Sequence, residues 1–472
     1  MYAIVNYLTE LIFRKYLFKI FKMSITVRLK KGLDIKLKGG AEKILAAEVI
    51  ANLYGVKPVD FPGLTPKLNV KEGDKVKAGS PLFHDKLRPE ILFTSPISGK
   101  VLFINRGDRR KLLEIVVEKE GDESIDFGKA DPSALSREKI KETILKSGLW
   151  PALRQRPYSI VANPADVPGS IFISGFDTAP LAPDYNFIAD NLSATNFKSG
   201  ITALKKLTDG KINLILNGKG ESSELLKRAS EVEISHFSGP HPAGNVGVQI
   251  HHLQPINKGD KVWTVNLQDV FAIGRLFEEG VYRHDRIIAL TGSEVLHPQY
   301  YKTRSGASIS SMVKDNLKSG NLRYISGNVL TGTRIENDGF LGYYDSQITV
   351  IPEGNYYEFF GWMMPGLNKF SFSKTFASSL LPRKSYSLDT NLHGGERAFV
   401  MTGMYEKVVP MDIYPMQLLK AILAEDIEMM ENLGIYEIAE EDFALCEYIC
   451  PSKVEIQSIV RKGIDLMIRE MS

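Results

Sequence analysis

PKLNVKEGDKVKAGSPLFHDKLRPEILFTSPISGKV, residues 66–101, is the stretch that decides the fold of the first part of this chain. Apolar residues alternate here with charged ones, and Gly73-Asp74 and Gly79-Ser80 interrupt the run as tight turns. Such short strands bury their apolar faces only by folding onto one another. The stretch therefore predicts a small barrel-sandwich, closed by a hairpin of Val101–Ile104 with Leu112–Val117.

This stretch also resembles the biotinyl and lipoyl carrier domains, through VKEGDKVKAG and the following SPISGKV. In those domains a lysine at a hairpin tip carries the prosthetic group, and Lys86 stands close to that place. Pro89 follows three positions later, where it fixes φ and removes a donor, and the connection to Ser95 is longer than a carrier uses. We therefore expect a structural barrel-sandwich with an unmodified Lys86. A carrier protein is the alternative.

The composition is that of an ordinary globular protein. A length of 472 residues predicts about three domains. The 59 basic and 56 acidic residues nearly cancel, so nothing points to a nucleic-acid partner. Cys446 and Cys450 are the only cysteines, which excludes a disulfide framework and suits a reducing compartment.

The first 22 residues differ from the rest, being rich in large apolar residues with four basic residues and one acid. Charges interrupt the apolar run before it could span a bilayer. Two interpretations follow. The residues form a membrane-surface helix, or translation starts at Met23, and we favour the start at Met23.

After an acidic, linker-like stretch at 119–131, strands and helices alternate. This order predicts a doubly wound, partly parallel, Rossmann-like sheet. The expected elements are a helix ending at Gly148, a strand at 169–175, a helix at 191–207, a strand at 212–218, a helix at 222–230 and a strand at 232–236.

A smaller mixed region follows and resembles a β-grasp domain of the SLBB type. Its expected elements are strands at 286–290, 322–325, 329–331, 343–351 and 356–360 and a helix within 305–317. We expect the aromatic residues of Tyr356–Trp362 to lie in the core. From Tyr414 the apolar spacing predicts helices, including 443–449 and 456–467.

Two possible ligand sites in the middle of the chain are incomplete. The loop Leu149–Tyr158 follows a helix, as a phosphate loop would, but Trp, Pro and Leu stand where glycines are needed. Its Arg154 and Arg156 could pair with an anion. His251 and His252 are adjacent, yet no cysteine or carboxylate cluster completes a metal site, so we expect packed histidines.

A third possible site is incomplete as well. Cys446 to Pro451 spells C-x₃-C-P, the end of a bacterial ferredoxin run. The two upstream ligand positions hold Phe443 and Glu440. Two thiolates alone do not hold a cubane cluster, so we expect free thiols packed inside the helical end.

Six stretches carry a more specific resemblance: KKGLDIKLKG, VKEGDKVKAGSPLF, SGLWPALRQRPYS, GPHPAGNVGVQIHHL, GGERAFVMTGMYEKVVPMDIYP and EEDFALCEYICPSKVE. With them the chain resembles the A subunit of the bacterial sodium-translocating NADH:quinone reductase, a membrane complex of six subunits. That protein is in turn similar to the NADH- and flavin-binding subunit of respiratory complex I, and to the cluster-bearing C subunit of the ion-translocating ferredoxin complex. The resemblance implies a flavoprotein scaffold that kept its fold and lost its cofactors.

The resemblance also implies an α/β multidomain layout. The expected parts are an extension at 1–22, a barrel-sandwich at 23–130, a Rossmann-like domain at 131–284, a β-grasp domain at 285–380 and a helical C-terminal domain at 381–472.

The implied role is that of a peripheral subunit on the cytoplasmic face of the inner membrane, supporting ubiquinone reduction coupled to sodium export. We expect no catalytic, cofactor-binding or metal-binding residue in this chain. NADH, flavins, iron centres and quinone would act in other subunits. The expected partners are the other five subunits, mainly the membrane ones, with quinone as a further candidate. Tyr356–Trp362 and Arg154–Tyr158 are the candidate docking surfaces. A working NADH-oxidising flavoprotein is the alternative enzyme, disfavoured by the missing glycines.

Overall fold

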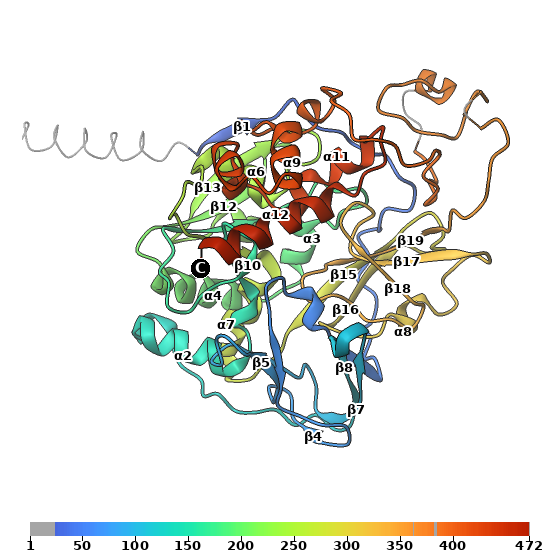
Figure 1. Cartoon of the computed structure of the whole chain (residues 1–472). Coiled ribbons are helices and arrows are strands. Elements are labelled where there is room, and N and C mark those ends of the chain that lie inside the picture. The colour runs from blue at the N-terminus through green and yellow to red at the C-terminus, as the bar shows by residue number, and fades with distance from the viewer. Residues whose placement is uncertain (1–23, 362, 382–384, 472) are drawn as a thin grey trace, which may run out of the picture.

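The structure is a computed structural model and describes residues 24–361, 363–381 and 385–471. The two interpretations of residues 1–22 lie outside this range. Figure 1 shows the strands of the barrel-sandwich, among them β4, β7 and β8, at the bottom, the α/β part in the middle, a second sheet to one side and the C-terminal helices on top. None of the described helices has the length and apolar character that crossing a membrane would require.

The barrel-sandwich forms as predicted from two facing sheets. One has the order β2-β8-β7-β4 and the other β3-β5-β6. The predicted hairpin is confirmed as β7 paired antiparallel with β8. Phe83 and Phe93 stack inside, with their ring centroids 4.6 Å apart. The strands are β2 (Leu53–Val56), β3 (Pro66–Leu68), β4 (Lys75–Val76), β5 (Pro81–Asp85), β6 (Leu92–Thr94), β7 (Gly99–Arg106) and β8 (Leu112–Lys119).

The largest sheet has seven strands in the order β1-β13-β12-β11-β14-β9-β10. The first five are mutually parallel, whereas β9 and β10 are antiparallel to their neighbours. The strands are β1 (Thr26–Arg28), β9 (Leu153–Arg156), β10 (Ile160–Val161), β11 (Ser170–Ser174), β12 (Lys211–Asn217), β13 (Glu233–Ser238) and β14 (Val262–Asn266).

The first strand lies away from the barrel-sandwich to which its sequence position suggested it belonged. β1 pairs with β13 from Thr26–His236 to Arg28–Ser238. Its apolar alternation fixes which side chains share a face, but it carries no information on which strand becomes its neighbour. The chain therefore begins in the α/β part and then crosses to the barrel-sandwich.

Alternation along the central strands gives the large sheet two apolar faces. Ile171 and Ile173 pack on one face, in a core shared with the barrel-sandwich and helices α2, α4 and α7. Phe172 packs on the opposite face, in a core shared with helix α6 and the C-terminal helices. The sheet is thus a layer between two helical layers. The helices are α2 (Arg137–Ser147), α3 (Tyr185–Asp190), α4 (Ala194–Leu207), α5 (Glu224–Lys227), α6 (Val246–Leu253) and α7 (Leu267–Glu279).

Several predicted elements of this part are confirmed and others differ. α2 ends at Gly148 as expected, and β11, β12 and β13 lie where the apolar runs predicted them. The helix expected over 191–207 is present as α4, which begins at Ala194 because the Ser193 side chain caps it, and the short helix α3 before it was not predicted. The helix expected over 222–230 is reduced to the single turn α5. β14 and α7 were not predicted.

The second mixed sheet has the order β16-β15-β19-β17-β18. A turn occupies 329–331, where a strand was expected, and the strand β18 follows it. The elements are β15 (Asp285–Thr291), β16 (Gln299–Arg304), α8 (Ser310–Val313), β17 (Leu322–Ser326), β18 (Thr333–Ile335) and β19 (Gln347–Pro352).

The predictions for 356–360 are wrong. These residues form no strand, and Tyr357 and Phe359 are 104% and 88% exposed instead of lying in a core. Aromatic residues favour a strand only where a neighbouring strand is available to pair, and none lies there among the described residues.

The helices predicted from Tyr414 onwards are present and pack on the large sheet. They are α9 (Pro415–Leu423), α10 (Ile427–Asn432), α11 (Ala444–Ile449) and α12 (Ile456–Met471). α9 buries Leu418, Leu419 and Ile422 on the face that the apolar spacing indicated, but Leu423 is exposed.

Candidate functional site

Hydrogen bonds of the residues on both sides of Lys86 fix the tip of the hairpin that resembles a carrier arm. β5 ends at Asp85, whose buried carboxylate accepts from Arg88 Nε at 2.9 Å and from Leu87 N at 3.1 Å. Arg88 Nη1 also donates to the Val161 carbonyl of β10, at 3.2 Å. Lys86 is exposed beside this contact. The tip is thus fixed to the α/β part, whereas a carrier arm must move between sites.

The two cysteines are buried inside the helical end, as predicted, and they form no disulfide. The Tyr405 hydroxyl donates to Cys450 Sγ at 3.0 Å. Burial raises the pKa of Cys446 well above its usual value, so its thiol stays protonated at neutral pH. Among the described residues, no three His, Cys, Asp or Glu side chains are grouped so that they could hold a metal.

The adjacent histidines of α6 bind the C-terminal segment. Asp412 N donates to His251 Nε2 at 3.0 Å, so the ring proton is on Nδ1, which lies 2.7 Å from Glu437 Oε2. His252 Nε2 donates to the Pro410 carbonyl at 2.9 Å. Both rings are therefore packed and hydrogen-bonded, as expected, and both hold α6 to the helical end.

The two arginines of the stretch Leu149–Tyr158, which contains β9, contact other parts of the chain. The Arg154 guanidinium lies over the Tyr344 ring, 4.9 Å from its centroid. Arg156 is 1% exposed and is paired through Nη2 with Glu441 Oε1 at 2.7 Å and through Nη1 with Asp442 Oδ2 at 3.3 Å. The prediction that Arg154–Tyr158 is a docking surface is therefore wrong, because the loop is covered by the chain itself.

The Asp442 carboxylate occupies the beginning of α6. A Cβ on Gly247, in the first turn of this helix, would lie 2.5 Å from Asp442 Oδ2. Asn245 Nδ2 and Ala439 N donate to the carboxylate at 3.4 and 2.9 Å. Burial raises the pKa of Asp442, and Arg156 opposes this shift by stabilising the charged form. A helix N-terminus attracts anions, and here the anion is the chain's own carboxylate.

A second buried charge cluster lies where α7 meets the second sheet. Asp269 Oδ1 lies 2.7 Å from His284 Nε2 and 2.8 Å from Arg286 Nη2, and all three side chains are fully buried. Arg286 Nη2 also donates to the Tyr343 carbonyl at 3.0 Å. Burial lowers the pKa of His284, with a further contribution from Arg286. Sequence reasoning missed this cluster, although His284-Asp285-Arg286 is a dense charged run before an apolar strand.

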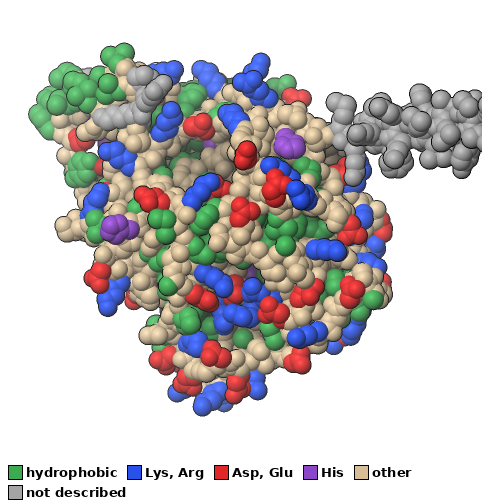
Figure 2. All heavy atoms as spheres, turned by 180° about the vertical axis from the view of Figure 1, so that it is seen from behind, with side chains coloured by type: hydrophobic (Ala, Val, Ile, Leu, Met, Phe, Trp, Pro, Cys, Tyr) green, Lys and Arg blue, Asp and Glu red, His purple; other side chains and the backbone are tan. Residues whose placement is uncertain are grey.

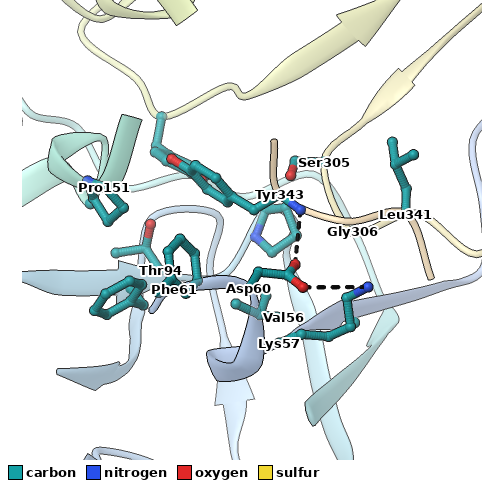
Figure 3. A pocket seen from close by; sticks show the side chains of 15 residues that line it. Val56, Lys57, Asp60, Phe61, Thr94, Pro151, Ser305, Gly306, Leu341 and Tyr343 are labelled. Atoms are coloured by element: carbon teal, nitrogen blue, oxygen red, sulfur yellow. Dashed lines mark hydrogen bonds and ion pairs between the residues drawn. The ribbon is translucent and has the colours of Figure 1, made fainter. Parts of the chain in front are cut away.

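The cavity in Figure 3 lies beside this cluster, where the barrel-sandwich, the α/β part and the second sheet meet. Asp60 Oδ2 accepts from Tyr343 N at 2.9 Å, and Asp60 Oδ1 lies 3.7 Å from Lys57 Nζ. Burial raises the pKa of Asp60 to about 6, against the opposing effect of Lys57. The cavity volume is about 20 Å³, enough for one water molecule. It has no room for a flavin, a nicotinamide or a quinone.

A much larger groove of about 1640 Å³ separates the second sheet from the helical end. Ile325 and Arg323 line it from the sheet, Phe359 and Phe370 from the irregular segment after β19, and Tyr448 from α11. Small-molecule pockets usually measure about 300–1,000 Å³. The size therefore suits a segment of another protein better than a small ligand. The aromatic density of 356–376 was the sequence signal for it.

The groove has charged groups at its edge, which are held by ion pairs. Arg323 donates through Nε and Nη2 to the two carboxylate oxygens of Glu353, at 2.7 and 2.6 Å. This bidentate bond is the main reason that the pKa of Glu353 falls to about 2. The floor of the groove is apolar, because Ile325, Ile351 and Val454 contribute to its lining.

Three family models match consecutive parts of the chain. The NqrA N-terminal barrel-sandwich hybrid domain matches residues 27–120, and the NqrA second alpha/beta domain matches residues 135–282. The NQRA C-terminal domain, of SLBB type, matches residues 287–337. The barrel-sandwich, the α/β part and the SLBB element of the fold prediction are confirmed by these matches.

Curated relatives extend the similarity to almost the whole chain. The A subunit of the Na(+)-translocating NADH-quinone reductase of Yersinia pseudotuberculosis serotype O:1b (strain IP 31758) is 42% identical over 439 residues, covering 92% of this chain and 98% of that protein. The corresponding proteins of Actinobacillus pleuropneumoniae serotype 5b (strain L20) and Klebsiella pneumoniae (strain 342) are 40% and 41% identical, each covering 94% of this chain and 100% of the relative.

A distant likeness exists to a solved NAD+-reducing [NiFe]-hydrogenase in the H2-reduced state. Identity is 12% and the TM-score 0.39, over 72% of this chain and 62% of that chain. This likeness is too weak to bear on function. The curated relatives, in contrast, are similar over their full length. The chain belongs to the family of A subunits of the Na(+)-translocating NADH-quinone reductase, an oxidoreductase complex of several subunits.

Proposed function

We propose that this chain is a peripheral, cofactor-free subunit that docks to the membrane subunits of the reductase on the cytoplasmic face. Electron transfer from NADH through flavins and iron centres to quinone, and the passage of sodium, would occur in other subunits. The observation that carries this proposal is the Arg156–Asp442 pair, because the Asp442 carboxylate pairs with the buried arginine and lies at the start of α6, where a ligand anion would otherwise bind.

The strand order supports a Rossmann-like ancestry for the α/β part. The parallel strands β13, β12, β11 and β14 lie side by side, and the order reverses between β11 and β14. In such folds ligands bind outside the carboxyl ends of the strands at this point. Here Ser174, at the end of β11, accepts from Gln249 Nε2 at 3.0 Å and donates to the Phe176 carbonyl at 2.9 Å. The Ser174 hydroxyl at the crevice is thus used within the chain.

The division at 130/131, 284/285 and 380/381 is part of the same proposal. The three family matches fall inside the first three of these parts. The helical C-terminal domain would then cover the side of the α/β part on which a cofactor would bind in a related flavoprotein. Its Glu441 and Asp442 pair with Arg156 there.

The groove is the proposed docking site for a segment of a membrane subunit. Its volume of about 1640 Å³ and its apolar floor suit a protein segment, and its paired Arg323 and Glu353 can position a polar backbone at the edge. Tyr356 and Phe359 of the predicted docking stretch line it. Quinone stays a candidate partner for the complex, without an assigned residue in this chain.

A deletion strain tests the proposal. Membranes that lack this chain should lose sodium-dependent quinone reduction but still oxidise NADH with an artificial electron acceptor, because the flavin subunit would remain intact. Complementation with the wild-type chain is the positive control, and complementation with an Ile325→Glu variant should fail because it places a charge on the groove floor. Quinone reduction at the wild-type rate in the deletion strain would show that this chain is dispensable.

A further inference from the structure

The exposed apolar side chains of this molecule are concentrated in one segment. Of the large hydrophobic residues that are exposed in the described part of the chain, half lie between 356 and 401. Among them are Tyr357 at 104%, Leu380 at 80% and Met363 at 65%. Large contiguous apolar patches on soluble proteins mark a contact with another protein or a membrane. These three side chains do not line the groove, so the proposed docking site does not account for them.

The central part of the same segment is basic. From Phe359 to Leu388 the sequence contains four basic residues and no aspartate or glutamate, whereas the whole chain has 59 basic and 56 acidic residues. The nearest acid on the N-terminal side, Glu358, is paired with Lys369. Lys374 is exposed. The segment therefore combines aromatic, Met and Leu side chains with an excess of positive charge.

The segment stands out from the body of the protein. In Figure 1 the orange chain between β19 and α9 extends beyond the second sheet and the helical end, and Figure 2 shows apolar side chains gathered at the corresponding upper corner. Its inner part is held together, because Ala377 N donates to the Pro365 carbonyl at 2.9 Å and Lys369 Nζ lies 5.8 Å from the Phe376 ring centroid. The exposed side chains are thus carried on a folded projection.

We propose that this projection, residues 356–388, rests on the surface of an anionic lipid bilayer, with Tyr357, Met363 and Leu380 at the headgroup level and Lys374 facing the lipid phosphates. The proposal rests on the proposed function, since it gives the side of the chain that would face the membrane. Aromatic residues sit at membrane interfaces with an apolar body and a polar tip, and basic residues are attracted to the anionic leaflet.

Co-sedimentation of the full chain with vesicles tests the proposal. One set of vesicles is phosphatidylcholine alone and the other an equal mixture with phosphatidylglycerol. The chain should bind the mixed vesicles more tightly, and Lys374→Glu should weaken this binding about tenfold, because it reverses a charge at the surface. A Tyr357→Ser, Met363→Ser, Leu380→Ser variant should lose most of it. The matched control is Ile50→Ser, Val167→Ser, Leu296→Ser, three exposed apolar residues elsewhere, which should bind like wild type.

Three results would overturn the proposal. In the first, the segment variants leave vesicle binding unchanged, whereas removal of residues 1–22 abolishes it. In the second, the chain binds neutral and mixed vesicles equally well. In the third, the chain binds neither kind of vesicle. If the segment variants still bind the mixed vesicles but no longer assemble with the membrane subunits, the segment is a contact with another protein. None of these results depends on the deletion-strain assay, so the two proposals fail independently.

Discussion

At the scale of single residues, the molecule is distinguished by charges that are buried and paired over long sequence distances. Arg156 and Asp442 are 286 positions apart, and both are almost fully buried. A buried pair gains little net stability, but removing one partner leaves the other charge unpaired in a medium that solvates it poorly. Substituting both partners of this buried pair with apolar residues should therefore cost less free energy of unfolding than substituting one of them.

The Arg156–Asp442 pair gives the first prediction. Arg156→Met should lower the free energy of unfolding by about 3–5 kcal/mol, because Asp442 and Glu441 lose their cation. Arg137→Met is the matched control, since Arg137 pairs with the exposed Asp209 and such surface pairs contribute about 0–1 kcal/mol. Urea unfolding of both variants measures the difference. Equal losses in the two variants would contradict the burial argument.

Asp60 gives a prediction about pH. Its folded pKa of about 6 exceeds the unfolded value, so the folded state binds the proton more tightly. This contribution is complete below about pH 4 and is lost as the pH rises through about 6. Asp60→Asn cannot titrate, so relative to wild type it should gain up to about 3 kcal/mol between these limits.

The measurement is the unfolding free energy of wild type and variant at several pH values between these limits. Asp338→Asn, which removes an exposed carboxylate, is the matched control and is measured at the same pH values. A constant difference for Asp60→Asn would show that this carboxylate titrates normally.

At the scale of elements, sequence reasoning succeeded where a local signal decides the structure. The apolar runs of β7, β8, β11, β12 and β13 and the stop of α2 at Gly148 are such signals. α7 was missed although its signals are present, since Asn266 caps its beginning and Gly280, with φ 72°, ends it. The partner of β1 and the Arg156–Asp442 contact have no local signal, because both depend on how distant segments meet.

The contact between α4 and α7 gives a prediction at this scale. A Cβ on Gly274 of α7 would lie 1.7 Å from the Asn196 carbonyl oxygen of α4, so the two helices approach closely because glycine is there. Gly274→Ala must push the helices apart and should cost at least about 1–3 kcal/mol. Gly395→Ala, at a glycine with open space around it, is the control and should leave the thermal midpoint almost unchanged. A small effect of Gly274→Ala would mean that the helix pair is loosely packed.

At the scale of the whole molecule, contacts within the chain occupy three of the incomplete sites. The carrier-like hairpin is bonded to β10, Arg156 of the incomplete phosphate loop is paired with Asp442, and the two cysteines are buried. The sequence revealed that each site was incomplete, but only the folded chain reveals which residues contact it. The groove and the exposed projection have a sequence signal in the aromatic residues of 356–376, but this signal fits a core as well as a surface.

The central claim is that this scaffold holds no redox cofactor and acts through contact. The most direct test is the absorption spectrum of the chain, purified without denaturation from its native membrane complex. We predict protein absorption alone, with no flavin or iron–sulfur bands in the visible range, and no change on adding NADH. A stoichiometric flavin or cluster spectrum that NADH bleaches would contradict the account and identify a working flavoprotein.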